Sequence, residues 1–312
     1  MRLPLALLAL AALPALLAPP ALPAAGAEPP RPPPPRVAVS IAPAAYWVQR
    51  IGGAKMQVEV MVPPGVEEET YTPSPRQLAD LLQARLYVAV GHPAFPLETH
   101  GLLPLLADHP EIRVVSMSRG VQLIPMGDAP AASRTTDPHF WNAPGPVAIA
   151  ARNIASGLEA VDPSRREAYR TGLAAFERDL AALDAAFRRV AAGPRPVRFI
   201  SYHPAWGYLA HQYGFDQLPV EAGGKEPGAA SLVALAAAAR RDGVRLVLVP
   251  VGLPRKQTEA LASSIGGKVL AVDYMARDWL AEMWRLAAAL AQIAQGAQGA
   301  DVTHGADTAG HS

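Results

Sequence analysis

Four polar positions that follow predicted strands or close a predicted lobe carry side chains that could bind a metal ion. The triplet Glu67 to Glu69 follows one strand, His203 follows a second and Asp273 follows a third. His139 lies in the loop that closes the first half of the chain. Imidazole nitrogens and carboxylate oxygens together make a reasonable site for a divalent metal such as zinc or manganese. The chemistry that these residues indicate is therefore metal coordination.

Each of these residues also has a plainer interpretation. A single His after a strand is often a surface or capping residue, a Glu triplet is often a solvated loop, and Asp273 could be the N-cap of a following turn. What favours a site is their coincidence in segments rich in Pro and aromatic residues. In open α/β sheets, ligands bind outside the carboxyl ends of the strands.

The elements that would position these residues are short strands alternating with helices. Strands are predicted at 37–41, 56–62, 86–90, 112–117, 197–201, 217–220, 244–249 and 269–272. Helices are predicted at 46–51, 76–83, 97–107, 147–161, 206–213, 231–241, 256–265 and 279–294. This alternation predicts an α/β fold of two lobes, each a mainly parallel sheet flanked by helices.

One long helix is predicted between the two halves, from about Ser164 to Ala192. Asp162-Pro163 is a helix start signal and Gly193-Pro194 a stop signal. The larger apolar residues, spaced alternately by four and three, form one seam: Tyr169, Leu173, Phe176, Leu180, Leu183, Phe187 and Val190. A lone coiled coil has the same periodicity, but strand-rich sequence on both sides favours a rigid backbone helix joining two lobes.

The predicted domain organisation follows from these elements. The N-terminal lobe spans 37–161, the linking helix 162–193 and the C-terminal lobe 194–294. The last segment, 295–312, is predicted to be a disordered tail, in which His304 and His311 offer at most weak metal contacts.

The first residues have the character of an export signal. Residues 1–27 combine a positive start, a short apolar run from Leu3 to Leu17 and small residues at 25–27. A membrane anchor is the alternative, but the run is short and interrupted by Pro. Residues 28–36 are predicted to be a Pro-rich tether. The sequence has no Cys, so neither disulfides nor a lipid-modified Cys can form, and we expect a soluble periplasmic protein without a lipid anchor.

The balance of charge bears on the choice of partner. With 28 basic and 27 acidic residues, the sequence offers no electrostatic reason to expect a nucleic-acid partner.

Several short segments resemble one known family. They are Met61-Val62-Pro63-Pro64-Gly65, Tyr71-Thr72-Pro73-Ser74-Pro75, Asp137-Pro138-His139-Phe140-Trp141, Tyr202-His203-Pro204-Ala205-Trp206-Gly207-Tyr208, Gly224-Lys225-Glu226-Pro227 and Val272-Asp273. From about Val37 to Ala294 the chain resembles the ZnuA/TroA-like zinc- and manganese-binding substrate-binding proteins of ABC transporters. That family has two α/β lobes joined by one long helix, as predicted above.

The resemblance implies metal ligands at His139, His203 and Asp273. The first ligand of the family is usually a His, and the alignment puts Glu69 at that position, with Glu68 where a Pro stands. Either Glu69 binds the metal through oxygen or water completes a three-ligand shell. A Glu in place of His makes the site harder, which shifts preference toward manganese or iron without excluding zinc.

Three functions are compatible with these residues. The first is a monomeric, non-catalytic periplasmic receptor that binds one divalent ion, zinc first and manganese next, between its lobes and delivers it to an ABC permease. The second is a periplasmic zinc hydrolase with three protein ligands and Glu69 as general base, although the sequence has no His-Glu-x-x-His motif. The third is an adhesin-like surface protein, against which the absence of a lipid-attachment Cys argues.

Overall fold

The computed structural model of the protein describes residues 33–63, 66, 68–126, 136–193, 195–221, 228–252 and 255–306. Residues 34–312 form one compact unit, distinct from residues 1–33. The predicted signal segment lies outside the described residues, as does most of the predicted tether. Among the described helices, none combines the length and the apolar character needed to cross a membrane.

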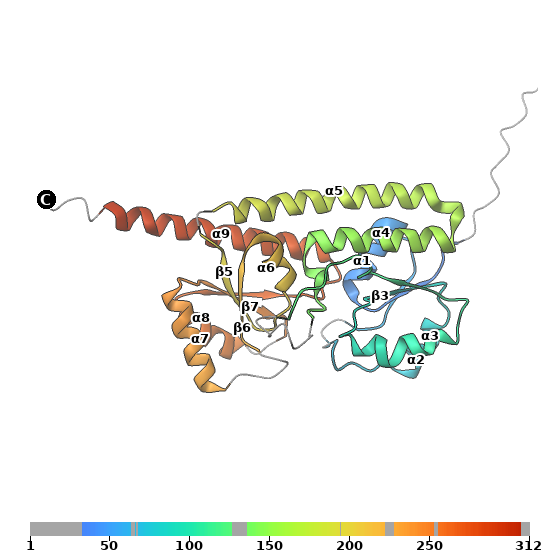
Figure 1. The fold of residues 1–312 in the computed structure, drawn as a ribbon, viewed down its shortest axis with the longest axis horizontal. Coiled ribbons are helices and arrows are strands. Elements are labelled where there is room, and N and C mark those ends of the chain that lie inside the picture. Colours follow the sequence, from blue (N-terminus) through green and yellow to red (C-terminus); the bar gives the residue numbers. More distant parts are fainter. Residues whose placement is uncertain are drawn as a thin grey trace, which may run out of the picture. The chain divides into compact units, whose positions relative to one another are not determined.

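The first half of this unit is a parallel four-stranded sheet in the order β2-β1-β3-β4. Its strands are β1 (Val37–Val39), β2 (Val58–Val60), β3 (Leu86–Ala89) and β4 (Arg113–Ser116). The helices between and after them are α1 (Ala42–Gly52), α2 (Pro75–Leu81), α3 (Leu103–Ala107) and α4 (Pro144–Val161). Figure 1 shows α2 and α3 on one face of this sheet and α1 and α4 on the other.

The second half repeats the plan with a parallel sheet in the order β6-β5-β7-β8. Its strands are β5 (Arg198–Ser201), β6 (Asp216–Pro219), β7 (Leu246–Pro250) and β8 (Lys268–Val272). Its helices are α6 (Gly207–Tyr213), α7 (Ala229–Arg241), α8 (Arg255–Ser264) and α9 (Trp279–Ala306). In both sheets the chain reverses its direction of strand addition beside the first strand, which is where parallel sheets open a crevice for ligands.

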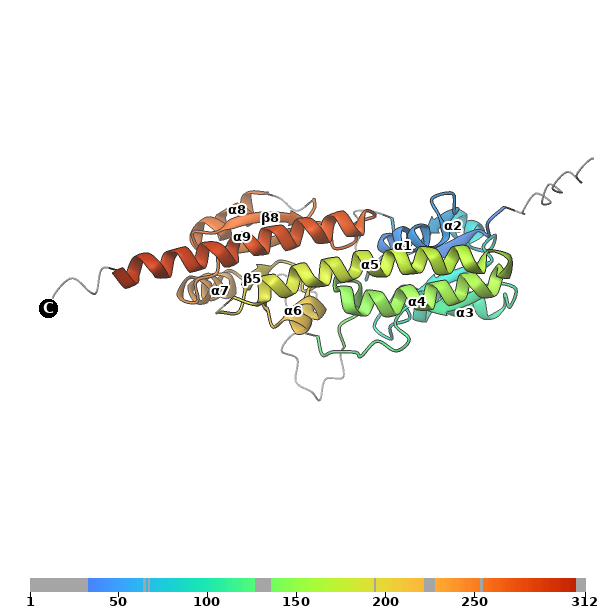
Figure 2. The same ribbon diagram turned by 90° about the horizontal axis from the view of Figure 1, so that it is seen from above.

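The long helix α5 (Arg166–Ala191, 26 residues) runs along both halves. It packs on α1 and α4 in the first lobe and on α6 and α9 in the second, and Figures 1 and 2 show it lying beside α4 and α9. Six of the seven predicted seam residues are buried, and Leu173 is partly buried. The predicted two-lobed α/β fold with one long joining helix is confirmed.

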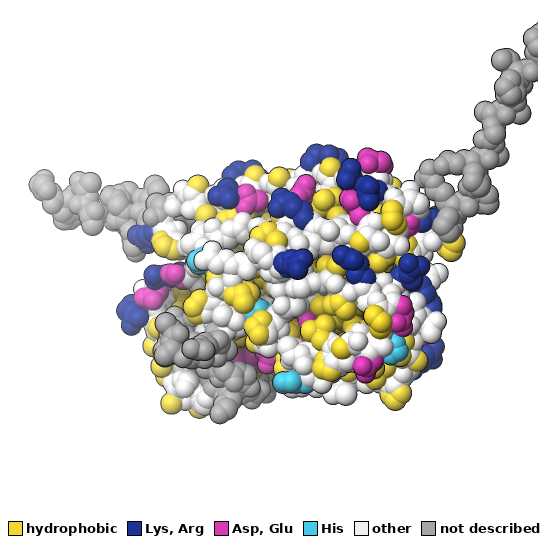
Figure 3. Space-filling model, turned by 45° about the vertical axis from the view of Figure 1, so that its right-hand side comes forward, with side chains coloured by type: hydrophobic (Ala, Val, Ile, Leu, Met, Phe, Trp, Pro, Cys, Tyr) yellow, Lys and Arg dark blue, Asp and Glu magenta, His cyan; other side chains and the backbone are white. Residues whose placement is uncertain are grey.

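Aromatic side chains on α5 connect the two lobes. Phe176 packs edge-on against Tyr46 of α1 and against Trp279 of α9, with ring centroids 6.2 and 6.5 Å apart. One apolar cluster accordingly includes buried residues of both lobes and of α5, and a second, smaller cluster lies within the second lobe around Ile200, Val247 and Ile265. On the face drawn in Figure 3, basic and acidic side chains lie interspersed along the long helices. Ion pairs that join α4 to α5 include Arg152–Glu177 and Arg166–Glu159.

Three local details differ from the sequence-based predictions. The Asp162 side chain does not cap the helix but binds the side chains of Ser164, Arg165 and Tyr169. The predicted helix 97–107 begins as a π-helix, η1 (Leu97–Leu102), because Pro104 lacks an N–H and the wider turn keeps its ring away from the preceding turn. Finally, α9 continues past Ala294 to Ala306, although this extension contains three Gly residues, which disfavour helix.

Candidate metal centre

The carboxyl ends of the second sheet's strands surround a cavity of about 350 Å³. Its lining includes His203 after β5, Glu221 after β6, Val251 after β7 and Asp273 after β8. Parallel strands end at one edge of their sheet, so residues separated by dozens of positions meet there. Val66, from the loop after β2 of the first lobe, also lines this cavity. The two lobes therefore face each other across it.

Behind His203, three side chains from both lobes converge in the interior. Glu68, His139 and His203 each bring one potential ligand atom to a group in which all three atoms lie within 4.8 Å of one another. The Nε2 atom of His139 lies 3.2 Å from Glu68 Oε1 and 3.2 Å from His203 Nε2. The side chains of His139, Glu68 and His203 are 0%, 1% and 7% exposed.

These separations match the ligand spacing around a tetrahedral ion. Zinc–nitrogen and zinc–oxygen bonds of about 2.0–2.2 Å at tetrahedral angles put neighbouring ligand atoms about 3.3–3.6 Å apart. The observed separations of 3.2 Å need to widen only slightly to take an ion between the three atoms. Two imidazoles and one carboxylate suit zinc, with manganese or iron as harder alternatives.

His139 is held by the residues around it in the sequence. Asp137 Oδ1 accepts a hydrogen bond from the His139 backbone N–H at 2.8 Å and also lies 2.8 Å from His139 Nδ1. The short turn Phe140–Asn142 follows at once. Its Trp141 donates to the Tyr274 carbonyl, and Trp279 donates to the Trp141 carbonyl. The Asp-Pro-His-Phe-Trp segment thus holds one candidate ligand and joins it to the opposite lobe.

Gly207 is required by the same arrangement. It begins α6, and a Cβ added there would collide with Asp137 Oδ2. Only glycine lets the buried Asp137 carboxylate approach so closely beneath His139, which explains the choice of residue at 207.

His203 is held by a different set of contacts. Its Nδ1 atom lies 3.0 Å from Glu221 Oε2. Its ring stacks on that of Tyr274, with centroids 5.0 Å apart and planes inclined by 20°. The Tyr274 hydroxyl donates to Glu68 Oε2 at 3.1 Å. Tyr274 therefore orients one imidazole and one carboxylate of the group together.

The electrostatics of the group depend on His139. Burial lowers the pKa of this imidazole, but the hydrogen bonds and negative charges of Asp137 and Glu68 outweigh burial and raise the pKa to about 10. Burial likewise raises the pKa of Glu68, but the His139 hydrogen bond and charge outweigh it and leave the pKa below its usual value. Without a metal, the pair is an imidazolium with an ionised carboxylate.

The four residues selected from the sequence are placed as follows. His139 and His203 lie in the group. The carboxylate that joins them is that of Glu68, whereas Glu69 is partly exposed and outside the group. Asp273 lines the cavity with His203, but its Oδ1 accepts the Met275 N–H at 3.0 Å, the capping role that was its plainer interpretation. Burial, and the charge of Glu282, raise its pKa.

Sequence reasoning missed three residues that the structure places beside the candidate ligands. Asp137 stands two positions before His139 in the resembling segment. Glu221 follows the strand predicted at 217–220, so the rule used for His203 and Asp273 should have selected it. Tyr274 had no signal in the sequence other than its position after Asp273.

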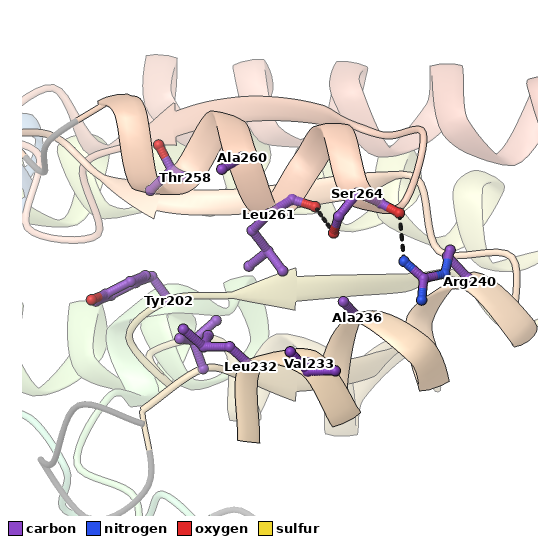
Figure 4. A pocket seen from close by; sticks show the side chains of 10 residues that line it. Tyr202, Leu232, Val233, Ala236, Arg240, Thr258, Ala260, Leu261 and Ser264 are labelled. Carbon is purple, nitrogen blue, oxygen red and sulfur yellow. Dashed lines mark hydrogen bonds between the residues drawn. The ribbon is translucent and has the colours of Figure 1, made fainter. Parts of the chain in front are cut away.

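Two other regions bear on the choice of ligands: the tail and a second cavity. His304 falls within α9, beyond the side chains that the structure describes, and His311 lies outside the described residues. A cavity of about 500 Å³ opens between α7 and α8. Figure 4 shows its apolar lining, with Leu232, Val233, Ala236 and Leu261 facing the space. No carboxylate or imidazole of the described residues lines it, so it is not suited to a divalent cation.

Two parallel α/β lobes that share one long helix, with imidazoles and a carboxylate gathered where the lobes meet, define the class of two-lobed metal-binding, solute-binding proteins. The family model described as zinc-uptake complex component A, periplasmic (ZnuA), matches residues 37–293. The chain belongs to this family.

Relatives of the chain include proteins named for different metals. The high-affinity zinc uptake system protein ZnuA of Bacillus subtilis (strain 168) is 26% identical over 243 residues, covering 74% of this chain and 76% of that protein. The iron-binding protein YfeA of Yersinia pestis is 30% identical over 174 residues, covering 54% of each protein. The crystal structure of a zinc-bound ZnuA deletion mutant is similar with a TM-score of 0.73 and 32% identity, covering 82% of this chain and 96% of that one.

Proposed function

We propose that this protein captures one divalent transition metal ion between its lobes, zinc first and manganese next, and delivers it to an ABC permease. The observation that supports this most directly is the buried group of Glu68, His139 and His203, in which His139 Nε2 lies 3.2 Å from a ligand atom of each of the other two. The ion is the transported cargo, and the names of the zinc-uptake relatives agree with this choice.

The proposed ligands are His139, His203 and a carboxylate of the loop after β2. We assign that carboxylate to Glu68, because Glu68 faces both imidazoles while Glu69 lies outside the group. Asp273 is proposed as the fourth ligand, since it lines the cavity next to His203. Four protein ligands would complete a tetrahedral shell and leave no position for a reactive water. A receptor without catalytic activity follows from that arrangement.

The hydrolase alternative requires Glu69 as a general base beside a metal-bound water. A general base must lie within hydrogen-bond reach of the proton that it accepts. Glu69 lies outside the group of three ligands, which favours the receptor. We propose further that residues 1–27 direct export to the periplasm, where the chain acts as a monomer without a lipid anchor.

The test is metal binding by the purified chain and three variants. We expect the wild type to bind one zinc ion. His139→Ala and Glu68→Gln should each weaken binding by more than the roughly 10–100-fold that losing an outer partner costs. Glu69→Gln is the matched control and should retain wild-type affinity. Affinities from competition with a chelating dye, with circular dichroism as a check on folding, give the comparison.

Two results would contradict the assignment. Unchanged stoichiometric binding by His139→Ala would show that the ion binds elsewhere. Loss of binding by Glu69→Gln but not by Glu68→Gln would show that Glu69, and not Glu68, is the ligand. Hydrolysis of a generic ester or peptide by the zinc-loaded protein, abolished by Glu69→Gln with zinc retained, would favour the enzyme. Elemental analysis of protein from its native compartment, followed by zinc–manganese competition, identifies the physiological metal.

A further inference from the structure

Glu221 is brought to His203 by the backbone of the second sheet. After β6 ends, the ladder to β5 continues for two residues: the Val220 N–H donates to the Ser201 carbonyl at 2.8 Å, and the Glu221 N–H donates to the Tyr202 carbonyl at 3.0 Å. This pairing sets the Glu221 carboxylate 3.0 Å from His203 Nδ1. The side chain is 19% exposed and lines the cavity in front of the group.

The two nitrogens of His203 are distinguished by this contact. A carboxylate is an acceptor only, so its partner Nδ1 carries the proton, and Nε2 presents its lone pair to His139 and Glu68. The stacked ring of Tyr274 restrains the plane of the imidazole. Stacking alone is equally satisfied when the ring is turned over by 180°, which would exchange the nitrogens. The Glu221 contact makes one of these two orientations the favoured one.

The other imidazole has a partner of a different kind. Asp137 is 1% exposed and bonds both the ring and the backbone of His139. Glu221 makes its contact with His203 from the cavity wall. One ligand is therefore fixed inside the first lobe, while the orientation of the other depends on a carboxylate that reaches the open side of the site.

We propose that Glu221 is a positioning residue for His203, an inference that rests on the proposed function. By holding His203 in place, Glu221 sets the affinity for zinc and the preference for zinc over manganese. A carboxylate on Nδ1 fixes the ring and makes Nε2 a better donor to a metal. Strong imidazole donation benefits zinc more than manganese, which is bound well by oxygen ligands alone. Glu221 need not touch the ion to have this effect.

The experiment compares Glu221→Gln and Glu221→Ala with the wild-type chain for binding of zinc and of manganese. We expect Glu221→Ala to bind zinc about 10–100-fold more weakly. Glu221→Gln should lie between, because its amide oxygen still accepts the Nδ1–H bond but the charge is gone. Manganese affinity should fall less, so the ratio of zinc to manganese affinity should decrease in the order wild type, Gln, Ala. Glu259→Gln, an exposed carboxylate in the same lobe, is the matched control and should change neither affinity.

Each outcome decides the inference. Wild-type zinc affinity in Glu221→Ala overturns it, as does an equal loss for both metals with a lower melting temperature, which would mean a merely structural role. If Glu221→Ala does not fold, the isosteric Gln variant decides the matter through the same affinity ratio. Failure of the wild-type chain to bind zinc or manganese would instead refute the proposed function. The absorption spectrum of the cobalt-substituted protein should also change in the Gln variant if the orientation of His203 is altered.

Discussion

In the metal-free protein, the buried imidazole of His139 lies between two carboxylates. Asp137 faces Nδ1 and Glu68 faces Nε2, and together they raise the pKa of His139 to about 10. A metal can bind Nε2 only after that nitrogen has lost its proton. The same carboxylate that attracts the cation therefore also holds the proton with which the cation competes.

Zinc binding is accordingly expected to release a proton and to strengthen with pH. Since the His139 pKa of about 10 lies above the working range, the apparent zinc affinity should rise roughly tenfold per pH unit between pH 6 and 8. Calorimetry in buffers of different ionisation enthalpy would count the protons released. Asp137→Asn, which removes one source of the raised pKa, should flatten this dependence. A wild-type affinity independent of pH over this range would show that His139 is already neutral.

The sequence pointed to Glu69, whereas the structure groups Glu68 with the two imidazoles. This difference shows which part of the site can be predicted from the sequence. The acidic triplet after the second strand could be proposed as a segment, because strand ends are visible in the pattern of Val residues. Which member faces the imidazoles depends on the turn between β2 and α2. Neighbouring residues in a turn point in different directions, and no periodicity in the sequence specifies which one points inward.

At the scale of elements, α5 is shaped by where its neighbours come closest. A Cβ added at Gly172 would fall against the carbonyl oxygen of Ile51, at the end of α1. Such backbone-to-backbone proximity leaves no flexible side chain to move aside. The predicted apolar seam was largely confirmed, but a single small residue within the helix decides how closely α1 can approach.

Gly172→Ala should therefore destabilise the protein, although Ala is the better helix former by about 1 kcal/mol. Separating α5 from α1 should cost about 1–3 kcal/mol overall. Gly101→Ala is the matched control, since no atom lies within 4 Å of a Cβ added there, and it should be neutral or slightly stabilising. Urea unfolding of both variants measures the difference. A Gly172→Ala variant as stable as the wild type would mean that the helices adjust without strain.

The π-helix η1 carries a further buried acid, Glu98. Its carboxylate accepts the Val90 and Gly91 N–H groups at 2.6 and 2.7 Å and binds the Ser40 hydroxyl. It therefore connects the ends of β1 and β3 at the crevice of the first sheet. Burial outweighs these hydrogen bonds and raises the pKa of Glu98 from 4.5 to about 7.

A carboxyl group whose pKa is raised by folding contributes to stability at low pH, and this contribution is lost as pH rises through the folded-state pKa. Below about pH 4.5 Glu98 is protonated in both the folded and the unfolded state. Between about pH 4.5 and 7 it ionises in the unfolded chain but stays protonated in the folded one, which lowers the free energy of the unfolded state. The loss amounts to about 3 kcal/mol. The difference in unfolding free energy between wild type and Glu98→Gln should therefore shrink as pH rises through this window. A difference that is constant with pH would contradict the raised pKa.

At the scale of the whole molecule, the two lobes share a common apolar cluster and one proposed ion. Phe176 of α5 packs against both lobes, and the candidate ligands come from both: Glu68 and His139 from the first, His203 from the second. An ion bound to all three would hold the lobes together in addition to the core. Opening of the site for release is then expected to involve its loops more than bending of α5.

Zinc should therefore raise the melting temperature of the protein in a single transition. Free zinc at 1,000 times the dissociation constant stabilises the folded state by about 4 kcal/mol. Differential scanning calorimetry with and without zinc measures the shift, which His203→Ala should abolish. Two separate transitions, with only one of them sensitive to zinc, would show that the ion is held by one lobe alone.

The sequence by itself determined the alternating strands and helices and the long joining helix, and it proposed the two histidines as ligands, because apolar periodicity, helix end signals and strand exits are local features of the chain. Only the tertiary structure decided that Glu68 faces His139, that Asp273 caps its own turn, and that Asp137 and Glu221 hold the two imidazoles. These contacts depend on the direction in which each side chain points and on which residues of another segment lie next to it. Both are settled by packing between residues far apart in the sequence.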